Sequence, residues 1–135
     1  MRVRQLRLSV TTEDYDPALR FYRDVLGLAV EGAHTSPDGG RVVILDAGRA
    51  TLELVDPAYA AYIDEVEVGR RVAGHLRVAL EVDDAQAATR TTLAAGAVLV
   101  APPTRTPWDS LNARLEGPAG LQLTLFEELG GDPGA

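Results

Sequence analysis

The sequence contains no cysteine among its 135 residues. Thiolate zinc sites, cysteine nucleophiles, thiol redox motifs and disulfide bonds are therefore excluded. A chain of this length can still bury enough apolar surface to fold as one domain without covalent cross-links. The lack of cysteine is compatible with a reducing compartment, and we expect a cytoplasmic protein.

Long apolar runs are missing as well. The opening residues, MRVRQLRLSV, do not contain the continuous apolar segment of a signal peptide. No window approaches the roughly 18 consecutive apolar residues that a membrane-spanning helix needs. We therefore expect a soluble protein that has no membrane partner.

Basic residues are fewer than acidic residues. The chain has 13 Lys and Arg against 20 Asp and Glu, which gives a net charge of −7 at pH 7. This balance argues against binding to the phosphate backbone of nucleic acids, so no nucleic-acid partner is expected. The chain also lacks a Walker-type phosphate loop, a Gly-x-Ser-x-Gly elbow and a His-Glu-x-x-His motif.

Apolar periodicity predicts the same series of elements twice. In the first half it predicts a strand, a helix and three strands, at residues 4–10, 17–26, 28–30, 41–45 and 51–55. In the second half the same order returns at residues 75–82, 85–95, 97–101, 111–115 and 121–126. Corresponding apolar positions are almost equally spaced, since Leu8 and Leu80 are 72 residues apart and Leu54 and Leu125 are 71 apart.

This repeat predicts an α+β fold built of two tandem βαβββ modules. We place the first module at residues 1–56, a linker with a helical turn around 58–64 at residues 57–74, and the second module at residues 75–128. Residues 129–135 are expected to be a disordered tail. If each helix covers the apolar face of its strands on the outside, the opposite faces form a curved, cup-shaped mixed sheet.

Polar side chains gather on those opposite faces, so the concavity is the predicted ligand site. The inward positions are Gln5, Arg7, Ser9, Thr51, Glu53, Val55, His75, Arg77, Ala79, Glu81, Gln122, Thr124 and Phe126. This set contains carboxylates, guanidinium groups, amides and hydroxyls, which are the groups that orient a small ligand.

Three segments carry a family resemblance: DYDPALRFYRDVLGLAV, the strand HLRVALEVDD, and the closing hairpin TPWDSLNARLEGPAGLQLTLFE. They resemble the vicinal oxygen chelate superfamily, also called the glyoxalase, bleomycin-resistance and extradiol dioxygenase group. The similarity extends from Val3 to Glu127. Many members pair into dimers, so the resemblance implies a homodimer.

The resemblance also implies four metal-ligand positions, occupied by His, Glu or Gln in the metal-dependent members. Here those positions carry Gln5, Glu53, Arg77 and Thr124. A guanidinium accepts no hydrogen bond and repels a cation, and a neutral hydroxyl is a poor substitute for a carboxylate. We therefore predict no metal cofactor and argue against metal-dependent glyoxalase or dioxygenase activity. The alternative is a divalent metal held by Glu53 and His75, which shares the face of Arg77.

Glu53 and Arg77 are predicted to meet in the concavity, because a buried carboxylate needs a partner. One interpretation is a structural ion pair that holds the two modules in register. In the other, Arg77 with Gln5 and Thr124 recognises an acidic or carbonyl-bearing molecule, and Glu53 is available as a general base. A tight bidentate pair would favour binding or structure, and a separated pair that opens on a pocket would favour catalysis.

Three further features lie near the expected cavity mouth or away from it. Trp108 precedes a strand at the rim, where it either fills a corner or stacks on a planar ligand. The charged linker segment 59–71 contains Arg70 and Arg71, which could close over an anion or pair with acids across a dimer. His34, in a turn rich in Gly, Pro and Asp, is expected to be solvated and far from the strands.

The leading hypothesis is a metal-free small-molecule binding protein of the bleomycin-resistance type, for which a net negative charge suits a cationic antibiotic. Its ligand-binding residues would be Gln5, Arg7, Glu53, His75, Arg77, Trp108 and Thr124. The alternative is a lyase, isomerase or dioxygenase of the same superfamily that uses Glu53 as base, or as metal ligand with His75. A third possibility is a structural domain whose cup is filled by Phe126, Leu111 and their neighbours.

Overall fold

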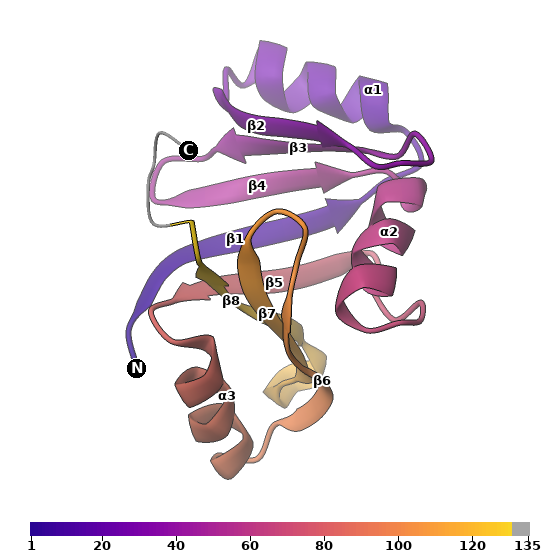
Figure 1. Cartoon of the computed structure of the whole chain (residues 1–135). Helices are drawn as coiled ribbons and strands as arrows, with labels where there is room; N and C mark the ends of the chain where they lie inside the picture. The colour runs from indigo at the N-terminus through magenta and orange to yellow at the C-terminus, as the bar shows by residue number, and fades with distance from the viewer. Residues whose placement is uncertain (131–135) are drawn as a thin grey trace.

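The computed structural model describes residues 1–130, which form one eight-stranded sheet with helices on both faces (Figure 1). The elements are β1 (Val3–Thr11), α1 (Tyr15–Leu19), the π-helical η1 (Arg20–Val25), β2 (Val30–Thr35), β3 (Arg41–Asp46), β4 (Ala50–Val55), α2 (Pro57–Glu67), β5 (Leu76–Val82), α3 (Ala85–Ala94), β6 (Val98–Arg105), β7 (Ser110–Glu116), the 3₁₀ turn η2 (Pro118–Gly120) and β8 (Gln122–Glu128). Most of the predicted tail, residues 131–135, lies outside the described residues.

The two halves of the chain have the same strand connectivity. The sheet order is β2-β3-β4-β1-β5-β8-β7-β6, so each half contributes four adjacent strands. In each half the first strand pairs in parallel with the last, β1 with β4 and β5 with β8. The halves join through the antiparallel pair β1 and β5. The predicted α+β fold of tandem βαβββ units sharing one mixed sheet is confirmed.

Helices α1 and α3 lie on the outer face of the sheet, one on each half. Tyr15 of α1 packs on an apolar cluster of β3 and β4 formed by Val43, Leu45 and Leu54. Helix α3 begins because the Asp84 carboxylate accepts a hydrogen bond from the Ala87 amide at 3.0 Å, and its small side chains pack on β7 and β8. Within residues 1–130, none of the helices combines the length and apolar content needed to cross a membrane.

Helix α2 lies on the other, concave face, within the stretch predicted as a linker. The Asp56 carboxylate accepts a hydrogen bond from the Tyr59 amide at 2.8 Å, and Pro57 occupies the first turn. Both features stabilise the start of the helix. Tyr59 and Ile63 pack on Val42 and Val55, whose side chains point away from α1. The predicted helical turn was too short, since α2 has 11 residues. Figure 1 shows α2 near the ends of β4 and β1.

Two strand predictions need correction. The strand predicted at 28–30 is wrong, because Leu28 packs partly buried under α1 and β2 starts only at Val30. β2 is an exposed edge strand, so its sequence shows no apolar alternation. β6 continues through Pro102 and Pro103 beyond the predicted end, which an edge strand tolerates because one side forms no ladder hydrogen bonds.

Candidate functional site

The concave face encloses a cavity of about 240 Å³ between the two halves of the sheet, α2 and the β6–β7 hairpin. Five of the seven predicted ligand-binding residues line it. These are Arg7 on β1, Glu53 on β4, Arg77 on β5, Trp108 in the hairpin and Thr124 on β8. Period-two alternation brings the four strand residues together, because each strand turns the same face inward, and the β6–β7 turn adds Trp108.

Glu53, Ser9 and Arg77 form a row across the three central strands. Ser9 on β1 pairs with Glu53 on β4 on one side and with Arg77 on β5 on the other. The Ser9 hydroxyl donates to Glu53 Oε1 at 2.7 Å. Arg77 Nη2 donates to Ser9 Oγ at 3.3 Å and to Glu53 Oε1 at 3.4 Å. Thr124 extends the row, because its Oγ1 accepts from Arg77 Nη1 at 2.7 Å.

The contact between Glu53 and Arg77 is single and long. Both hydrogen bonds of the carboxylate go to Oε1. Within residues 1–130 nothing donates to Oε2, and no buried side-chain polar atom lacks a partner, so Oε2 is accessible from the cavity. The geometry is therefore not the tight bidentate pair of a purely structural bridge. It is a loosely paired carboxylate that opens on a pocket.

Arg77 takes the place that a bound cation would need. Burial lowers the pKa of its guanidinium, with the charge of Arg114 adding to the effect, yet an arginine remains a cation in proteins. With Arg77 bonded to Thr124 and contacting Glu53, the residues at the family's ligand positions do not fit a divalent metal. In the described part of the chain, no group of three or more His, Asp or Glu side chains could hold one. We derive no chemical step through a metal.

The other two predicted residues, Gln5 and His75, are not among the residues that line the cavity. Gln5 lies two residues before Arg7 on β1, and its Oε1 accepts a hydrogen bond from Arg7 Nη2 at 3.3 Å. His75 precedes β5 and is exposed, with Nδ1 donating to the Thr11 carbonyl oxygen at 2.9 Å. The structure therefore does not bring His75 to Glu53 at the cavity.

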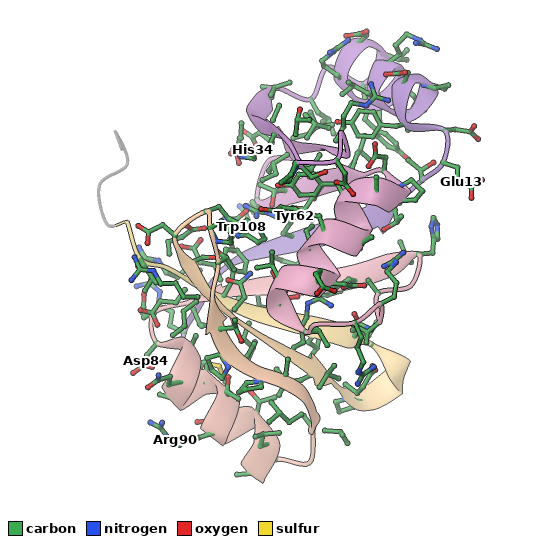
Figure 2. All side chains as sticks on the ribbon, turned by 45° about the vertical axis from the view of Figure 1, so that its right-hand side comes forward. Glu13, His34, Tyr62, Asp84, Arg90 and Trp108 are labelled. Carbon is green, nitrogen blue, oxygen red and sulfur yellow. The ribbon has the colours of Figure 1, made fainter. Side chains whose placement is uncertain are left out.

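Aromatic side chains surround the cavity mouth. Figure 2 shows Trp108 beside Tyr62 of α2, with Arg90 of α3 and Asp84, which precedes that helix, far away; His34 lines the same cavity as Trp108. The Tyr62 ring lies 6.1 Å from that of Trp108 and 5.5 Å from that of Tyr59. Trp108 is 36% exposed, so it is a rim residue and not a core residue. The expected position of His34 was wrong, because this exposed residue belongs to β2 and lines the cavity.

A buried ionic cluster ties α2 to the second half of the sheet. Arg114 of β7 donates from Nε to Glu67 Oε1 at 2.7 Å and from Nη2 to Asp64 Oδ1 at 2.9 Å. Asn112 donates to the other Glu67 oxygen at 2.8 Å. Arg71 pairs with Asp64 at 2.7 Å within the same chain, so this arginine of the linker braces α2.

The carboxylate of Asp64 is stabilised in its charged form. Burial opposes ionisation, but hydrogen bonds from the amides of Ala73 and Val72 and from Arg71, with the charge of Arg114, lower the Asp64 pKa below its usual value. The carboxylate is therefore an integral part of the fold at neutral pH. The helix that forms one wall of the cavity is held in place by charge as well as by apolar packing.

Sequence reasoning missed the inward face of β7. Ser110, Asn112 and Arg114 alternate with Leu111, Ala113 and Leu115, and this pattern would have revealed them. Leu111 packs on the α3 side. The cup is therefore not filled by Leu111, and a cavity remains beside Phe126.

Glu128 was missed although it stands two residues after Phe126 on the same face of β8. It lines the cavity. Burial raises its pKa, the charge of Glu81 adds to that effect and Arg7 opposes it. The cavity is therefore lined by three carboxyl groups, those of Glu53, Glu67 and Glu128, and Glu128 is the one without an ion pair to an arginine within residues 1–130.

Solved structures of similar fold include methylmalonyl-CoA epimerases. One, in complex with methylmalonyl-CoA and NH4+, is 20% identical, with 95% of this chain and 96% of that chain covered and a TM-score of 0.69. The enzyme from Mycobacterium tuberculosis is 22% identical, with coverages of 93% and 89% and a TM-score of 0.68. A variant from Streptomyces coelicolor in complex with 2-nitronate-propionyl-CoA is 20% identical, with coverages of 94% and 99% and a TM-score of 0.68. At these identities the likeness shows the fold alone.

No curated protein sequence matches the chain. The family model of the Glyoxalase/Bleomycin resistance protein/Dioxygenase superfamily matches residues 4–125, which is most of the sequence. The paired βαβββ units and the cavity on the concave face agree with this match. The chain belongs to the glyoxalase/bleomycin resistance protein/dioxygenase superfamily, whose members share the vicinal oxygen chelate fold.

Proposed function

We propose that the cup binds a small organic molecule bearing a carboxylate or carbonyl group, and that it does so without a metal. The observation that carries the proposal is the buried Arg77 guanidinium at the cavity. It has five N–H groups and makes three hydrogen bonds, to Thr124, Ser9 and Glu53. The remaining donors are available to a ligand oxygen, and a guanidinium fork suits carboxylates and carbonyls.

The rest of the cavity supports a ligand with an apolar body. Val42, Ile44, Tyr59 and Phe126 form apolar walls, and Trp108 stands at the rim. Such a mixture of apolar surface and few polar groups is typical of small-molecule sites. The epimerases of similar fold are described with acyl-CoA ligands, which carry carbonyl groups. The net charge favours a cationic antibiotic, but the guanidinium groups at the cavity favour an acidic ligand, which we adopt.

Binding is tested by titrating the protein with carboxylic acids, 2-oxo acids and acyl thioesters while recording Trp108 fluorescence and heats of binding. We expect saturable binding that survives chelator treatment. Arg77→Gln should weaken binding by at least about tenfold, whereas the exposed control Arg105→Gln should not. Equal affinity of both variants would show that Arg77 does not recognise the ligand. Elemental analysis of protein purified without chelators should find no stoichiometric metal.

A second candidate function is a metal-independent isomerase or lyase with Glu53 as general base. The accessible Oε2 favours it, because a base needs a free lone pair at the cavity. In the first step a C–H bond next to the bound carbonyl breaks, the proton passes to Glu53 Oε2, and the electron pair moves to the carbonyl oxygen. Arg77 would stabilise the resulting enolate.

Deuterium exchange separates binding from turnover. Incubation of a bound thioester or keto acid in D2O should replace its α-hydrogen, as read by proton NMR, if Glu53 acts as a base. Glu53→Gln should then abolish exchange and leave binding largely intact. Tight binding without exchange in the native protein would support sequestration and contradict the catalytic candidate.

We also propose a cytoplasmic homodimer. Leu6 on β1 and Leu76 on β5 are exposed large apolar residues on strands that join the two modules. A second copy of the chain covering such side chains would remove them from water. Light scattering during size-exclusion chromatography should give the mass of two chains, and Leu6→Glu with Leu76→Glu should give one. A single-chain mass for the native protein would contradict this proposal.

A further inference from the structure

Arg7 is a cation at the cavity without a carboxylate partner. Its Nε donates to Thr51 Oγ1 at 3.1 Å and its Nη2 to Gln5 Oε1 at 3.3 Å, and both acceptors are neutral. The guanidinium lies over the Phe126 ring, 5.1 Å from its centre. None of the ion pairs within residues 1–130 includes Arg7. An uncompensated guanidinium in a partly buried cavity attracts an anion.

The position of this guanidinium is fixed before any ligand arrives. Thr51 Oγ1 donates to Gln5 Oε1 at 2.6 Å, and Gln5 Nε2 donates to Glu81 Oε1 at 3.0 Å. These bonds hold the two acceptors that in turn hold Nε and Nη2 of Arg7. Nη1 makes no hydrogen bond to residues 1–130, and no buried polar side-chain atom is left without a partner, so Nη1 is accessible. A donor fixed in advance loses little entropy when it binds.

Arg7 and Arg77 stand close together on the inner face of the sheet. Arg7 on β1 is opposite Ala79 on β5, and Arg77 is two residues before Ala79. Diagonal positions of this kind are about 7–8 Å apart in an antiparallel pair. Both residues line the same cavity. Arg77 makes one long contact with Glu53, and Arg7 makes no ion pair within residues 1–130, so both guanidinium groups keep N–H donors free at the cavity.

We propose that the ligand of the cup is a dicarboxylate, or a carboxylic acid with a second carbonyl-containing end, held at one end by Arg77 and at the other by Arg7. This inference rests on the proposed function of Arg77 and adds the second subsite. Phe126 would contact the carbon chain between the two polar ends, since it lines the cavity beneath the Arg7 guanidinium. Recognition of both ends would select against monocarboxylates of the same length.

Glu128 does not contradict anion binding at this end. It lines the cavity, and Arg7 lowers its pKa, yet burial and the charges of Glu81 and Asp109 raise it overall. No ion pair joins Glu128 to Arg7 within 4.0 Å among the ion pairs of residues 1–130. Arg7 therefore interacts with Glu128 only at longer range and forms no ion pair with it, so Nη1 of Arg7 stays available to a ligand oxygen.

The test compares acids of equal chain length by isothermal titration calorimetry. The probes are succinate, glutarate, adipate and pimelate, each paired with its monocarboxylate, from butyrate to heptanoate. One dicarboxylate should bind at least about tenfold more tightly than its monocarboxylate partner, because a charge-assisted contact contributes roughly one to two powers of ten in affinity. Arg7→Gln should remove that advantage, so that the dicarboxylate and its monocarboxylate partner bind with about equal affinity.

Two variants keep the result interpretable. Arg7→Lys retains the charge and loses the fork, so it should retain part of the advantage even if Arg7→Gln fails to fold. Arg90→Gln, on the exposed surface of α3, controls for net charge and should behave as the native protein does.

The outcomes distinguish a failure of the second subsite from a failure of the proposed function. If monocarboxylates bind through Arg77 and dicarboxylates bind no better, or if Arg7→Gln and Arg7→Lys keep the full advantage, the second subsite is overturned and the proposed function stands. If no carboxylate binds the native protein at millimolar concentration, both are overturned.

Discussion

Two arginines are buried on the inner face of this sheet, and they are compensated very differently. Arg114 is fully buried and contacts two carboxylates, at 2.7 Å and 2.9 Å, and its third contact is Gln122 at 3.0 Å. Arg77 is 8% exposed and contacts one carboxylate, at 3.4 Å, and two hydroxyl groups. Taking a charge out of water costs several kcal/mol unless partners replace the lost hydration. Arg114 has those partners within the fold, whereas Arg77 can still donate to a further acceptor, such as a ligand oxygen.

The difference separates a structural charge from a functional one. The Arg114 cluster is closed, because every carboxylate oxygen of Asp64 and Glu67 accepts a hydrogen bond from within the chain. The Arg77 row is open, because Glu53 Oε2 and several N–H groups of Arg77 remain available at the cavity. A ligand would complete the open row. Glu67 and Asn112 of the closed cluster also line the cavity, but both Glu67 oxygens already accept hydrogen bonds within the chain.

Arg114→Met should have the largest effect on stability. The substitution leaves Asp64 and Glu67 buried with fewer partners, and loss of one member of a buried pair costs about 3–5 kcal/mol. Urea unfolding followed by circular dichroism gives the free energy of unfolding. The exposed control Arg105→Met should change it by less than about 1 kcal/mol. A change below about 1 kcal/mol for Arg114→Met would remove the structural half of the comparison.

Arg77→Met should destabilise the protein less, by about 1–3 kcal/mol. It should weaken ligand binding more than any Arg114 variant that still folds. Glu53 loses one long contact, keeps the Ser9 hydrogen bond and can reach water through Oε2. A double-mutant cycle with Glu53→Gln measures the coupling within the pair. Coupling as large as that between Arg114 and Glu67 would show that Glu53 and Arg77 form a structural pair after all.

The open row could be predicted from sequence, and the closed cluster could not. Alternation along single strands assigns Glu53, Arg77 and Thr124 to one face, and the repeat places those strands side by side. The partners of Arg114, in contrast, are 47 and 50 residues away on a helix of the linker. No local pattern specifies where a connecting helix docks, because its position depends on the packing of Tyr59 and Ile63 on Val42 and Val55.

His34 shows the same limit from another side. Its neighbours Gly32, Pro37 and Gly39 are typical of a turn, and β2 is an edge strand without a buried face. Its place at the cavity follows from the pairing of β2 with β3, which brings His34 opposite Val42. Pairing between strands is a tertiary property that the sequence of one edge strand does not encode.

The carboxyl groups Glu128 and Asp64 extend the comparison to pH. The Asp64 pKa is lowered, so its contribution to stability is present above its unfolded value of 3.8 and is lost as the pH falls through the folded pKa. The Glu128 pKa is raised, so its contribution is present below its unfolded value of 4.5 and is lost as the pH rises through the folded pKa. Opposite signs are expected because Asp64 is compensated and Glu128 is not.

Glu128→Gln should therefore stabilise the protein slightly at pH 7, by less than about 1 kcal/mol because the side chain is partly solvated, and the gain should vanish near pH 4. Thermal unfolding at the two pH values measures the difference, with Glu116→Gln on the exposed end of β7 as control. A loss of stability at pH 7 would mean that Glu128 is paired as well as Asp64 is, and the cavity would be less open than the structure indicates.

At pH 7 the smallest effect on stability is expected at Tyr59, which belongs to both regions because it packs α2 on the sheet and also lines the cavity. Burial, with minor contributions from Tyr62 and Glu53, raises its pKa from 10.0 to about 12. Between these values the unfolded chain releases a proton that the folded chain keeps, so stability falls as the pH rises above about 10. Tyr59→Phe removes this slope, and the native protein should lose more stability than the variant between about pH 8 and pH 11. Equal losses would mean that water reaches the Tyr59 hydroxyl in the folded protein. The open cavity would then extend past Tyr59 toward Glu67.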